Sequence, residues 1–544
     1  MKSFPLTVVV TVLCCLGLDA GSDRQPDTQG SQQPATYQSK PVLKAKTRLV
    51  VVDVVATDHQ GQPISGLETQ DFTLLEDGRP QKISAFSFQH PGVTVTQVSL
   101  RLPPNVVSNS PQHTASSLNV ILLDTLNGDF AGHAAAQDAL IKYLDSAQLK
   151  QPLAIFAMQE KLILLHDFTT DNQALKSVVQ KFKPPVRANS AESLESRSSP
   201  FSNKGDFHTD DRNIEATLTQ LHALARTLAG YPGRKNVIWL SESFPLVLTP
   251  EVATKNGYGY QDFSVTEQYA RVPTAVDNLR TASPGNDFAG FVKKVAEAMM
   301  NAQVAIYPVD SAGLTKDDHL AAQHTMSDLA YSTGGRAFYN RNDLEVSLRT
   351  SLEDGAIYYT LSYYPDNKQW DGKFRTITVK AAREGAGLRY RLGYYALDPE
   401  ASAKDEPKRV AEDFSRALTL DAPGLGAVQF QAGVVSPSDK TQGKVVVNFA
   451  IDPHTIGFEK QEDGLHHASV SCVVWAYSGK GNPVRSEGDS NATVKPDVFQ
   501  QVMKSLYPCQ RSISLKPGHY TLRLGVIDRT TNRIGTASSE ITVP

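Results

Sequence analysis

Oxygen-bearing side chains stand where several apolar runs of this sequence end. The run that begins at Asn119 stops abruptly at Asp124, and two later apolar runs also finish on polar or acidic residues. Carboxylate, amide and hydroxyl oxygens are the ligands that Mg²⁺ and Ca²⁺ take in proteins, so the pattern is compatible with a divalent-metal site. The candidate metal ligands are Asp124, Asn127, Asp129, Ser241, Glu242 and Asp310.

The apolar runs are typical of strands buried on both faces of a parallel sheet. Ligands of such α/β sheets bind at the carboxyl ends of the strands, and in the usual 3-2-1-4-5-6 order the strands ending in Asp124, Glu242 and Asp310 are neighbours. Three carboxylates at one edge repel one another unless a cation, a base or protonation intervenes. We therefore expect these residues to form one polar face that is open to a partner.

Motifs of catalysis are absent from the sequence. It contains no G-x-S-x-G elbow, no H-E-x-x-H and no phosphate-binding G-x-x-x-x-G-K-[ST]. His319 and His324 are spaced so that they fall on different faces of a helix. Arg234 and Lys235 precede their strand, and we expect them in a solvated turn at the edge opposite the ligand end.

The predicted fold class is α/β, a doubly wound and mostly parallel sheet flanked by β-sandwich elements, with an immunoglobulin-like β-sandwich at the C-terminus. Strands alternate with helical patterns over residues 115–355, which predicts helices on both faces of the sheet. Two long segments inside it, 183–210 and 243–286, have the composition of surface loops.

The segments on either side of the α/β region have the two-residue period of β-strands. Residues 47–90 contain an Asp77-Gly78 hairpin signal, and residues 356–397 read as three further strands. Each set has too few strands to form a stable sandwich alone. We therefore hypothesise that the two sets pair with each other, with the α/β region inserted between them. Residues 398–422 are interpreted as a linker, and short strands over 423–544 predict the second sandwich.

The N-terminus has the pattern of a secretory signal peptide over residues 1–20, followed by a Gln/Ser/Pro-rich linker over 21–46. Cys14 and Cys15 leave a lipoprotein open as the alternative. No transmembrane helix is expected after cleavage. The two remaining cysteines, Cys472 and Cys509, form either a disulfide or two buried thiols.

The composition excludes one class of partner. The 544 residues carry a formal net charge of -3 with 20% charged residues, so no strong field attracts a polyanion, and nucleic acid is not expected as a partner. A protein or another macromolecule of the cell envelope fits better. The composition does not determine the oligomeric state.

The stretches NVILLD, YPGRKNVIWLSESFP, VAIYPVDSAGL, TGGRAFYNRNDL and YRLGYYA resemble the exported VWFA-related proteins abundant in acidobacteria. The resemblance covers roughly Thr47 to Ala396 and implies a von Willebrand factor A-type domain. That family has no assigned biochemical activity. Its A-type domains typically bind a divalent cation through D-x-S-x-S, a threonine from a second loop and an aspartate from a third.

This sequence departs from that ligand pattern. Asp124 matches the first ligand, but Leu126 and Gly128 stand at the two serine positions, and Ser241-Glu242 stands where the third-loop aspartate is expected. The threonine has three candidates: Thr169, Thr170 and Thr209. The resemblance therefore leaves two alternatives, a modified site for Mg²⁺ or Ca²⁺, or a lost site whose acids cap helices and bond loop amides.

We therefore expect an exported, non-enzymatic binding or adhesion-type protein, periplasmic, secreted or on the cell surface, with a degenerate metal-ion-dependent adhesion site. The alternatives are a cell-envelope hydrolase with dispersed catalytic residues and an inert structural spacer.

Overall fold

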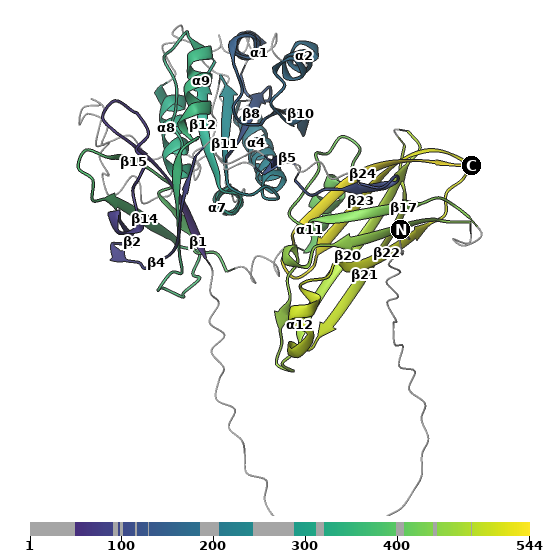
Figure 1. The fold of residues 1–544 in the computed structure, drawn as a ribbon. Helices are drawn as coiled ribbons and strands as arrows, with labels where there is room; N and C mark the ends of the chain where they lie inside the picture. Colours follow the sequence, from purple (N-terminus) through teal and green to yellow (C-terminus); the bar gives the residue numbers. More distant parts are fainter. Residues whose placement is uncertain are drawn as a thin grey trace, which may run out of the picture. The chain divides into compact units, whose positions relative to one another are not determined.

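The computed structural model in Figure 1 describes most of the chain after residue 48. Thr47–Pro544 is one unit by its internal contacts, separate from Met1–Lys46. The described residues are 49–90, 96–97, 102–111, 113–114, 117–128, 130–184, 206–242, 288–311, 320–398, 407–438, 443–479 and 481–544. The predicted signal peptide, the linker over 21–46, the segment 243–286 and most of 183–210 lie outside these residues.

A five-stranded sheet forms the centre of the α/β region, in the order β10-β9-β8-β11-β12. Its strands are β8 (Ser117–Asp124), β9 (Leu153–Met158), β10 (Leu162–Thr169), β11 (Arg234–Ser241) and β12 (Val304–Asp310). All neighbours are parallel except β10, which runs antiparallel to β9. Four of the strands are buried at every position, which is why they read as continuous apolar runs. The prediction of a mostly parallel sheet is confirmed.

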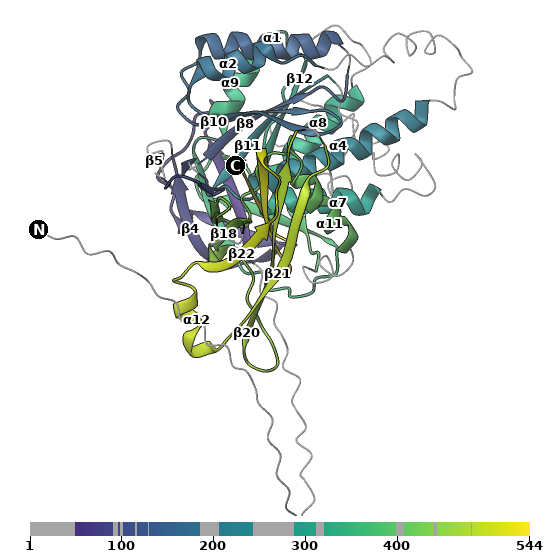
Figure 2. The ribbon, with the colours of Figure 1, turned by 90° about the vertical axis from the view of Figure 1, so that its right-hand side faces the viewer.

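Helices cover both faces of this sheet (Figure 2). One face packs on α1 (Phe130–Ser146), α2 (Asn172–Lys181) and α9 (Leu344–Asp354). The other packs on α4 (Asp206–Leu228), α7 (Phe288–Asn301) and α8 (Leu320–Thr333). Two hydrophobic cores result, one above the sheet and one below it.

The strands before and after the α/β region pair with each other. In one sheet β1 (Val50–Thr57) lies between β13 (Tyr358–Tyr363) and β15 (Gly387–Arg389), and β4 (Ile83–Gln89) pairs with β13. The α/β region therefore leaves and re-enters one sheet, as an inserted region would.

A second sheet combines the same two parts of the chain. It consists of β2 (Phe72–Glu76), β3 (Arg79–Pro80), β14 (Phe374–Ala381) and β16 (Gly393–Tyr395). Asp77 and Gly78 join β2 to β3 with φ values of 48° and 77°, the left-handed conformations that a tight hairpin turn requires. Side chains of both sheets share one hydrophobic core.

Two further antiparallel sheets consist mainly of strands from the C-terminal part of the chain and share a hydrophobic core. One contains β6 (Val106–Ser108), β17 (Phe430–Val435), β18 (Val445–Ile451) and β22 (Tyr507–Ile513). The other contains β19 (Glu459–Lys460), β20 (His466–Tyr477), β21 (Val484–Val494), β23 (Gly518–Asp528) and β24 (Ile534–Val543). The immunoglobulin-like assignment stays a prediction.

Short elements complete the described chain. They are β5 (Thr96–Gln97) paired with β7 (His113–Thr114), α12 (Pro496–Val502), and 3₁₀ turns at Thr69–Asp71 and Pro453–Thr455. The segment interpreted as a linker, 398–422, contains a helix, α11 (Pro407–Ala417). Phe414 and Leu418 from this stretch pack with Trp475 on the sheet that contains β20. Part of the segment interpreted as a linker is therefore a helix that packs by its apolar side.

Candidate functional site at the carboxyl edge of the parallel sheet

The structure places three of the candidate residues at the ends of neighbouring strands. Ser241 at the end of β11 is paired in register with Asp310 at the end of β12. Asp124 ends β8, and the preceding residue of β8, Leu123, is in register with Leu240 of β11. The parallel order of the sheet thus gathers Asp124, Ser241 and Asp310 at one edge.

The Asp124 carboxylate accepts five hydrogen bonds from protein donors. Its Oδ1 accepts from the backbone N–H groups of Leu126 and Asn127, each at 2.9 Å. Its Oδ2 accepts from Asn127 Nδ2 at 3.0 Å, Trp239 Nε1 at 3.0 Å and Ser241 Oγ at 2.8 Å. A carboxylate offers about four lone-pair positions, so these donors fill its capacity.

Helix α4 reaches the same site through a threonine. Asn127 Nδ2 donates both to Asp124 and to Thr217 Oγ1, the latter at 3.0 Å. Thr217 is completely buried, so its hydroxyl needs a partner inside the protein. None of the three threonine candidates from the sequence fills this role. Trp239 and Thr217 are the members of the site that sequence reasoning missed.

Glu242 packs into a cradle formed by two glycines. A Cβ built on Gly132, in the first turn of α1, would lie 2.9 Å from Glu242 Cβ, and one built on Gly128 would lie 2.8 Å from the same atom. Gly128 also has a φ of 93°, a conformation that side chains disfavour. Both glycines therefore permit a close approach of the α1 terminus to the end of β11.

The candidate residues are buried, which corrects the expectation of an open polar face. The exposed fractions are 2% for Asp124, 4% for Asn127, 1% for Ser241, 5% for Glu242 and 4% for Asp310. Burial raises the pKa of Asp124 above its ordinary value, while the hydrogen bonds from Asn127, Ser241 and Leu126 act in the opposite direction. Asp129 lies outside the described residues.

The donors around Asp124 do not suit a resident metal ion. An indole N–H, an amide NH₂ and backbone N–H groups can only donate hydrogen bonds, whereas a cation needs oxygen lone pairs. Within the described part of the chain, no group of three or more His, Cys, Asp or Glu side chains is arranged to hold a metal. Leu126 and Gly128 add no side-chain oxygen. The site for Mg²⁺ or Ca²⁺ therefore stays a prediction without support from these residues.

The opposite edge of the sheet also holds buried charge. Arg234 is 2% exposed and Lys235 is 1% exposed, so the expectation of a solvated turn is wrong. The Arg234 guanidinium donates to Tyr307 Oη at 3.3 Å and to the Gly334 carbonyl at 2.7 Å. Its backbone N–H donates to Tyr358 Oη on β13, so this edge contacts the flanking sheet.

Lys235 is buried at the same edge as Arg234, but fewer hydrogen bonds offset the burial of its charge. Its Nζ donates to the Tyr231 carbonyl at 2.9 Å. Burial lowers the pKa of Lys235 to about 7, and the negative charge of Asp53 on β1 offsets part of this effect. Asp53 itself accepts hydrogen bonds from Thr360 Oγ1 at 2.8 Å and Gln303 Nε2 at 3.2 Å.

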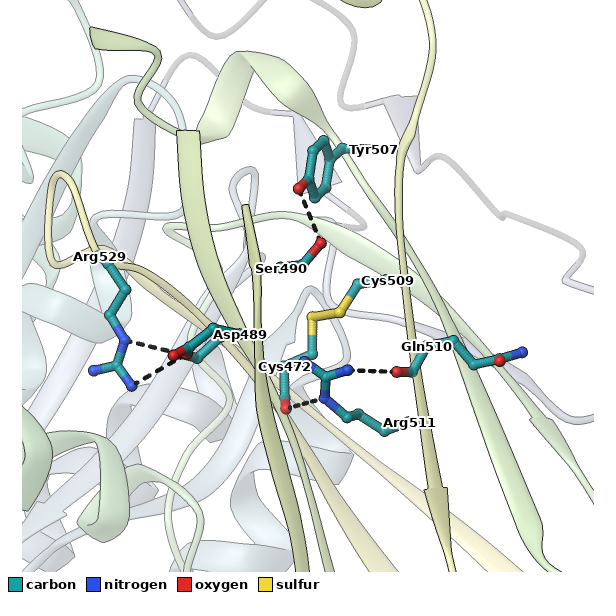
Figure 3. The surroundings of a disulfide bond; sticks show 9 residues. Cys472, Asp489, Ser490, Tyr507, Cys509, Gln510, Arg511 and Arg529 are labelled. Carbon is teal, nitrogen blue, oxygen red and sulfur yellow. Dashed lines mark hydrogen bonds and ion pairs between the residues drawn. A yellow bond between two sulfur atoms is a disulfide. The ribbon is translucent and has the colours of Figure 1, made fainter. Parts of the chain in front are cut away.

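A disulfide joins Cys472 on β20 to Cys509 on β22 (Figure 3). It links the two C-terminal sheets beside Arg511, whose Nε donates to the Cys472 carbonyl at 3.0 Å. Disulfides persist in oxidising compartments, so this bond suggests an extracytoplasmic location. Among the helices of the described residues, none has the length and apolar character needed to cross a membrane.

No protein-family model and no curated protein sequence matches this chain. Among solved structures, it is similar to the vWF domain of the type V pili tip protein Mfa5 from Porphyromonas gingivalis, with 10% identity over 43% of this chain and 93% of that one. It is also similar to the PilB minor pilin from Streptococcus sanguinis, with 11% identity over 44% and 60% of the two chains. A von Willebrand factor type A protein from Catenulispora acidiphila matches with 10% identity over 88% and 74%.

The TM-scores of these three similarities are 0.23, 0.22 and 0.22. Scores this low carry no argument about the chain's activity or partners. The functional conclusion therefore depends on the geometry of the site itself.

Proposed function

We propose that this chain is an exported, non-enzymatic binding protein that engages a protein or another cell-envelope macromolecule at the carboxyl edge of its parallel sheet. The proposal includes no resident metal ion, so the adhesion-type site would be a degenerate one. Membership of the VWFA-related exported proteins belongs to the same proposal. The single observation that carries it is the set of five protein donors on Asp124, which occupy the oxygen lone pairs that a cation would need.

The five-donor arrangement makes the edge a rigid scaffold for the residues around it. Its donors come from the turn after β8 and from β11, and Asn127 extends the network to α4. Buried polar networks whose members are all satisfied hold one conformation. A scaffold of this kind suits binding through neighbouring exposed groups better than binding through the buried acid itself.

Phe130 is the exposed group that points to recognition. It is the first residue of α1, two positions after Gly128, and 66% of it is exposed. Aromatic side chains, Phe among them, are enriched at protein interfaces relative to the rest of the surface. The edge therefore offers an apolar anchor beside a preorganised polar network.

The test uses the full-length chain and a purified cell-envelope fraction of the source organism. Wild type, Phe130→Ser and the matched control Val484→Ser are compared, because Val484 is 47% exposed on β21, which belongs to a different sheet. We expect Phe130→Ser to reduce specific binding at least tenfold and the control to leave it unchanged. Binding should also persist in EDTA. Equal binding by all three chains would contradict the proposed edge, and loss of binding in EDTA would contradict its metal independence.

A further inference from the structure

One strand of the C-terminal core comes from a distant part of the chain. Strand β6, residues Val106–Ser108, precedes the α/β region, yet it forms the edge of the sheet that contains β17. The two strands are antiparallel, with Val107 in register with Ala432. Only three residues of β6 cover the six-residue strand β17. The C-terminal sheet is thus completed by a short donated strand.

Side-chain contacts make this pairing specific. Asn109 Oδ1 accepts from the Phe430 N–H at 2.8 Å, and Asn109 Nδ2 donates to the carbonyls of Leu425 and Val428, each at 2.8 Å. Val107 packs against the C-terminal hydrophobic core. The edge of β17 therefore recognises an extended segment with an apolar residue two positions before an asparagine.

We propose that the edge of β17 is a strand-accepting site that takes the Asn105–Asn109 segment of a second copy of this chain by strand exchange. The hydrogen bonds and the Val107 contact are the same whether the segment comes from the same chain or from another copy. Exchange of an identical element is a low-cost route to association. The three residues of β6 are each only half-buried, so β6 itself loses little burial when it leaves β17.

The register provides a direct chemical probe of the exchange. Val106 lies opposite Gly433, and the neighbouring hydrogen bond from Val434 N–H to the Asn105 carbonyl makes this a non-hydrogen-bonded pair. A Cβ added to Gly433 would lie 3.9 Å from Val106 Cγ2, an ordinary contact distance. Cysteines at the two positions are therefore placed to form a disulfide across the strands.

The experiment mixes two full-length chains. The donor chain carries Val106→Cys with its strand otherwise intact. The acceptor chain carries Gly433→Cys and also Val107→Asp, which weakens its own β6 and leaves its β17 edge free. After oxidation, non-reducing gels measure the disulfide-linked heterodimer. The control acceptor replaces Gly433→Cys with Val484→Cys, an exposed thiol on β21 outside the proposed site.

We expect the heterodimer yield of the Gly433→Cys acceptor to exceed that of the Val484→Cys control several-fold. Restoring Val107 in the acceptor should reduce the yield, because its own strand then competes. Equal yields with the two cysteine positions would overturn the proposal. None of these outcomes depends on Phe130, so the result is independent of the proposed carboxyl-edge function.

A second measurement guards against poor folding of the acceptor. A fluorescent peptide with the sequence of Pro103–Ser110 is titrated into the Val107→Asp chain and into wild type, and polarisation reports binding. We expect saturable binding to the Val107→Asp chain and at least tenfold weaker binding to wild type, whose site is filled. A matched peptide with Asp and Ala in place of Val107 and Asn109 should not bind. Equal binding of both peptides, or of neither, would overturn the proposal.

Discussion

The two ends of the parallel sheet bury charge in different ways. At the carboxyl end, Asp124 accepts five hydrogen bonds from neutral donors. At the amino end, Lys235 donates to the Tyr231 carbonyl, and burial lowers its pKa to about 7. The carboxylate is held by hydrogen bonds within its own sheet and the adjoining turn, whereas the amine is buried near Asp53 of the flanking sheet.

This difference separates two roles for a buried charge. A fully hydrogen-bonded carboxylate fixes the conformation of the loops around it and is expensive to remove. An amine with weak compensation loses its proton instead, so its effect on stability depends on pH. The stability contributed by the carboxyl end should therefore depend on which side chains are present. The stability contributed by the amino end should depend on whether Lys235 is protonated.

The largest expected effect is that of Asp124→Ala. This change leaves five buried donors without their acceptor, so we expect the free energy of unfolding to fall by about 4 kcal/mol. Urea denaturation followed by circular dichroism measures it. The matched control is Asp138→Ala on the exposed side of α1, which should change stability by less than about 0.5 kcal/mol. Similar losses of stability in both variants would show that the five hydrogen bonds to Asp124 contribute little to the stability of the carboxyl end.

Lys235→Met tests the amino end. The folded pKa of about 7 lies below the ordinary lysine pKa of 10.5, which applies to the unfolded chain, so the unfolded chain binds the extra proton between these values. Stability should therefore rise with pH in this window, by up to about 1.4 kcal/mol per pH unit from this group.

Urea denaturation at pH 7, 8.5 and 10 should show Lys235→Met as the more stable chain at pH 7, with the difference shrinking as pH rises. The exposed control Lys142→Met should keep the wild-type slope. A slope that survives in Lys235→Met would show that another group causes it.

Gly132→Ala tests the close packing of α1 against Glu242 at the carboxyl end of the sheet. Alanine normally stabilises a helix relative to glycine by about 1 kcal/mol. Here its Cβ would meet Glu242 Cβ at 2.9 Å, so we expect a loss of about 2 kcal/mol instead. Thermal unfolding of Gly132→Ala and of Gly132→Ala with Glu242→Gly measures the effect, because the second change removes the clashing Cβ. If Gly132→Ala were more stable than wild type, the packing of Gly128 and Gly132 around Glu242 would have room for an added Cβ.

Thr217→Val should give the smallest effect. The substitution removes the hydroxyl that accepts from Asn127 Nδ2 but keeps the shape of the side chain, so we expect a loss of about 1 kcal/mol. In a double-mutant cycle with Asn127→Ala, the two losses should be less than additive, because both variants break the same contact. Strictly additive losses would show that Thr217 on α4 is not energetically coupled to Asn127 and the Asp124 network.

Much of the α/β region follows from local sequence. Apolar runs that end on Asp124, Ser241 and Asp310 are buried parallel strands, and their order brings these ends together. The burial of the site cannot be predicted from local sequence, because it depends on side chains that are distant in the sequence. Trp239 and Thr217 lie 115 and 90 residues from the groups that they contact, and neither stands in a motif.

The misread segments have a similar cause. Arg234 and Lys235 look like solvated charges, but contacts with the flanking strands bury them, and those strands lie far away in the sequence. Helix α11 is not predicted because charged residues predominate in its sequence. Its few apolar side chains form a recognisable face only where they pack on the sheet that contains β20. Local periodicity predicts elements well, whereas burial of charge requires the assembled chain.

Calorimetric titration of the full-length protein with Mg²⁺, Ca²⁺ and Mn²⁺ tests whether the Asp124 carboxylate is closed to cations. If protein donors occupy the Asp124 carboxylate, wild type and Asp124→Asn should both show no specific uptake of any of the three ions. Stoichiometric uptake by wild type that is lost in Asp124→Asn would contradict the account, because Asp124 would then be a metal ligand.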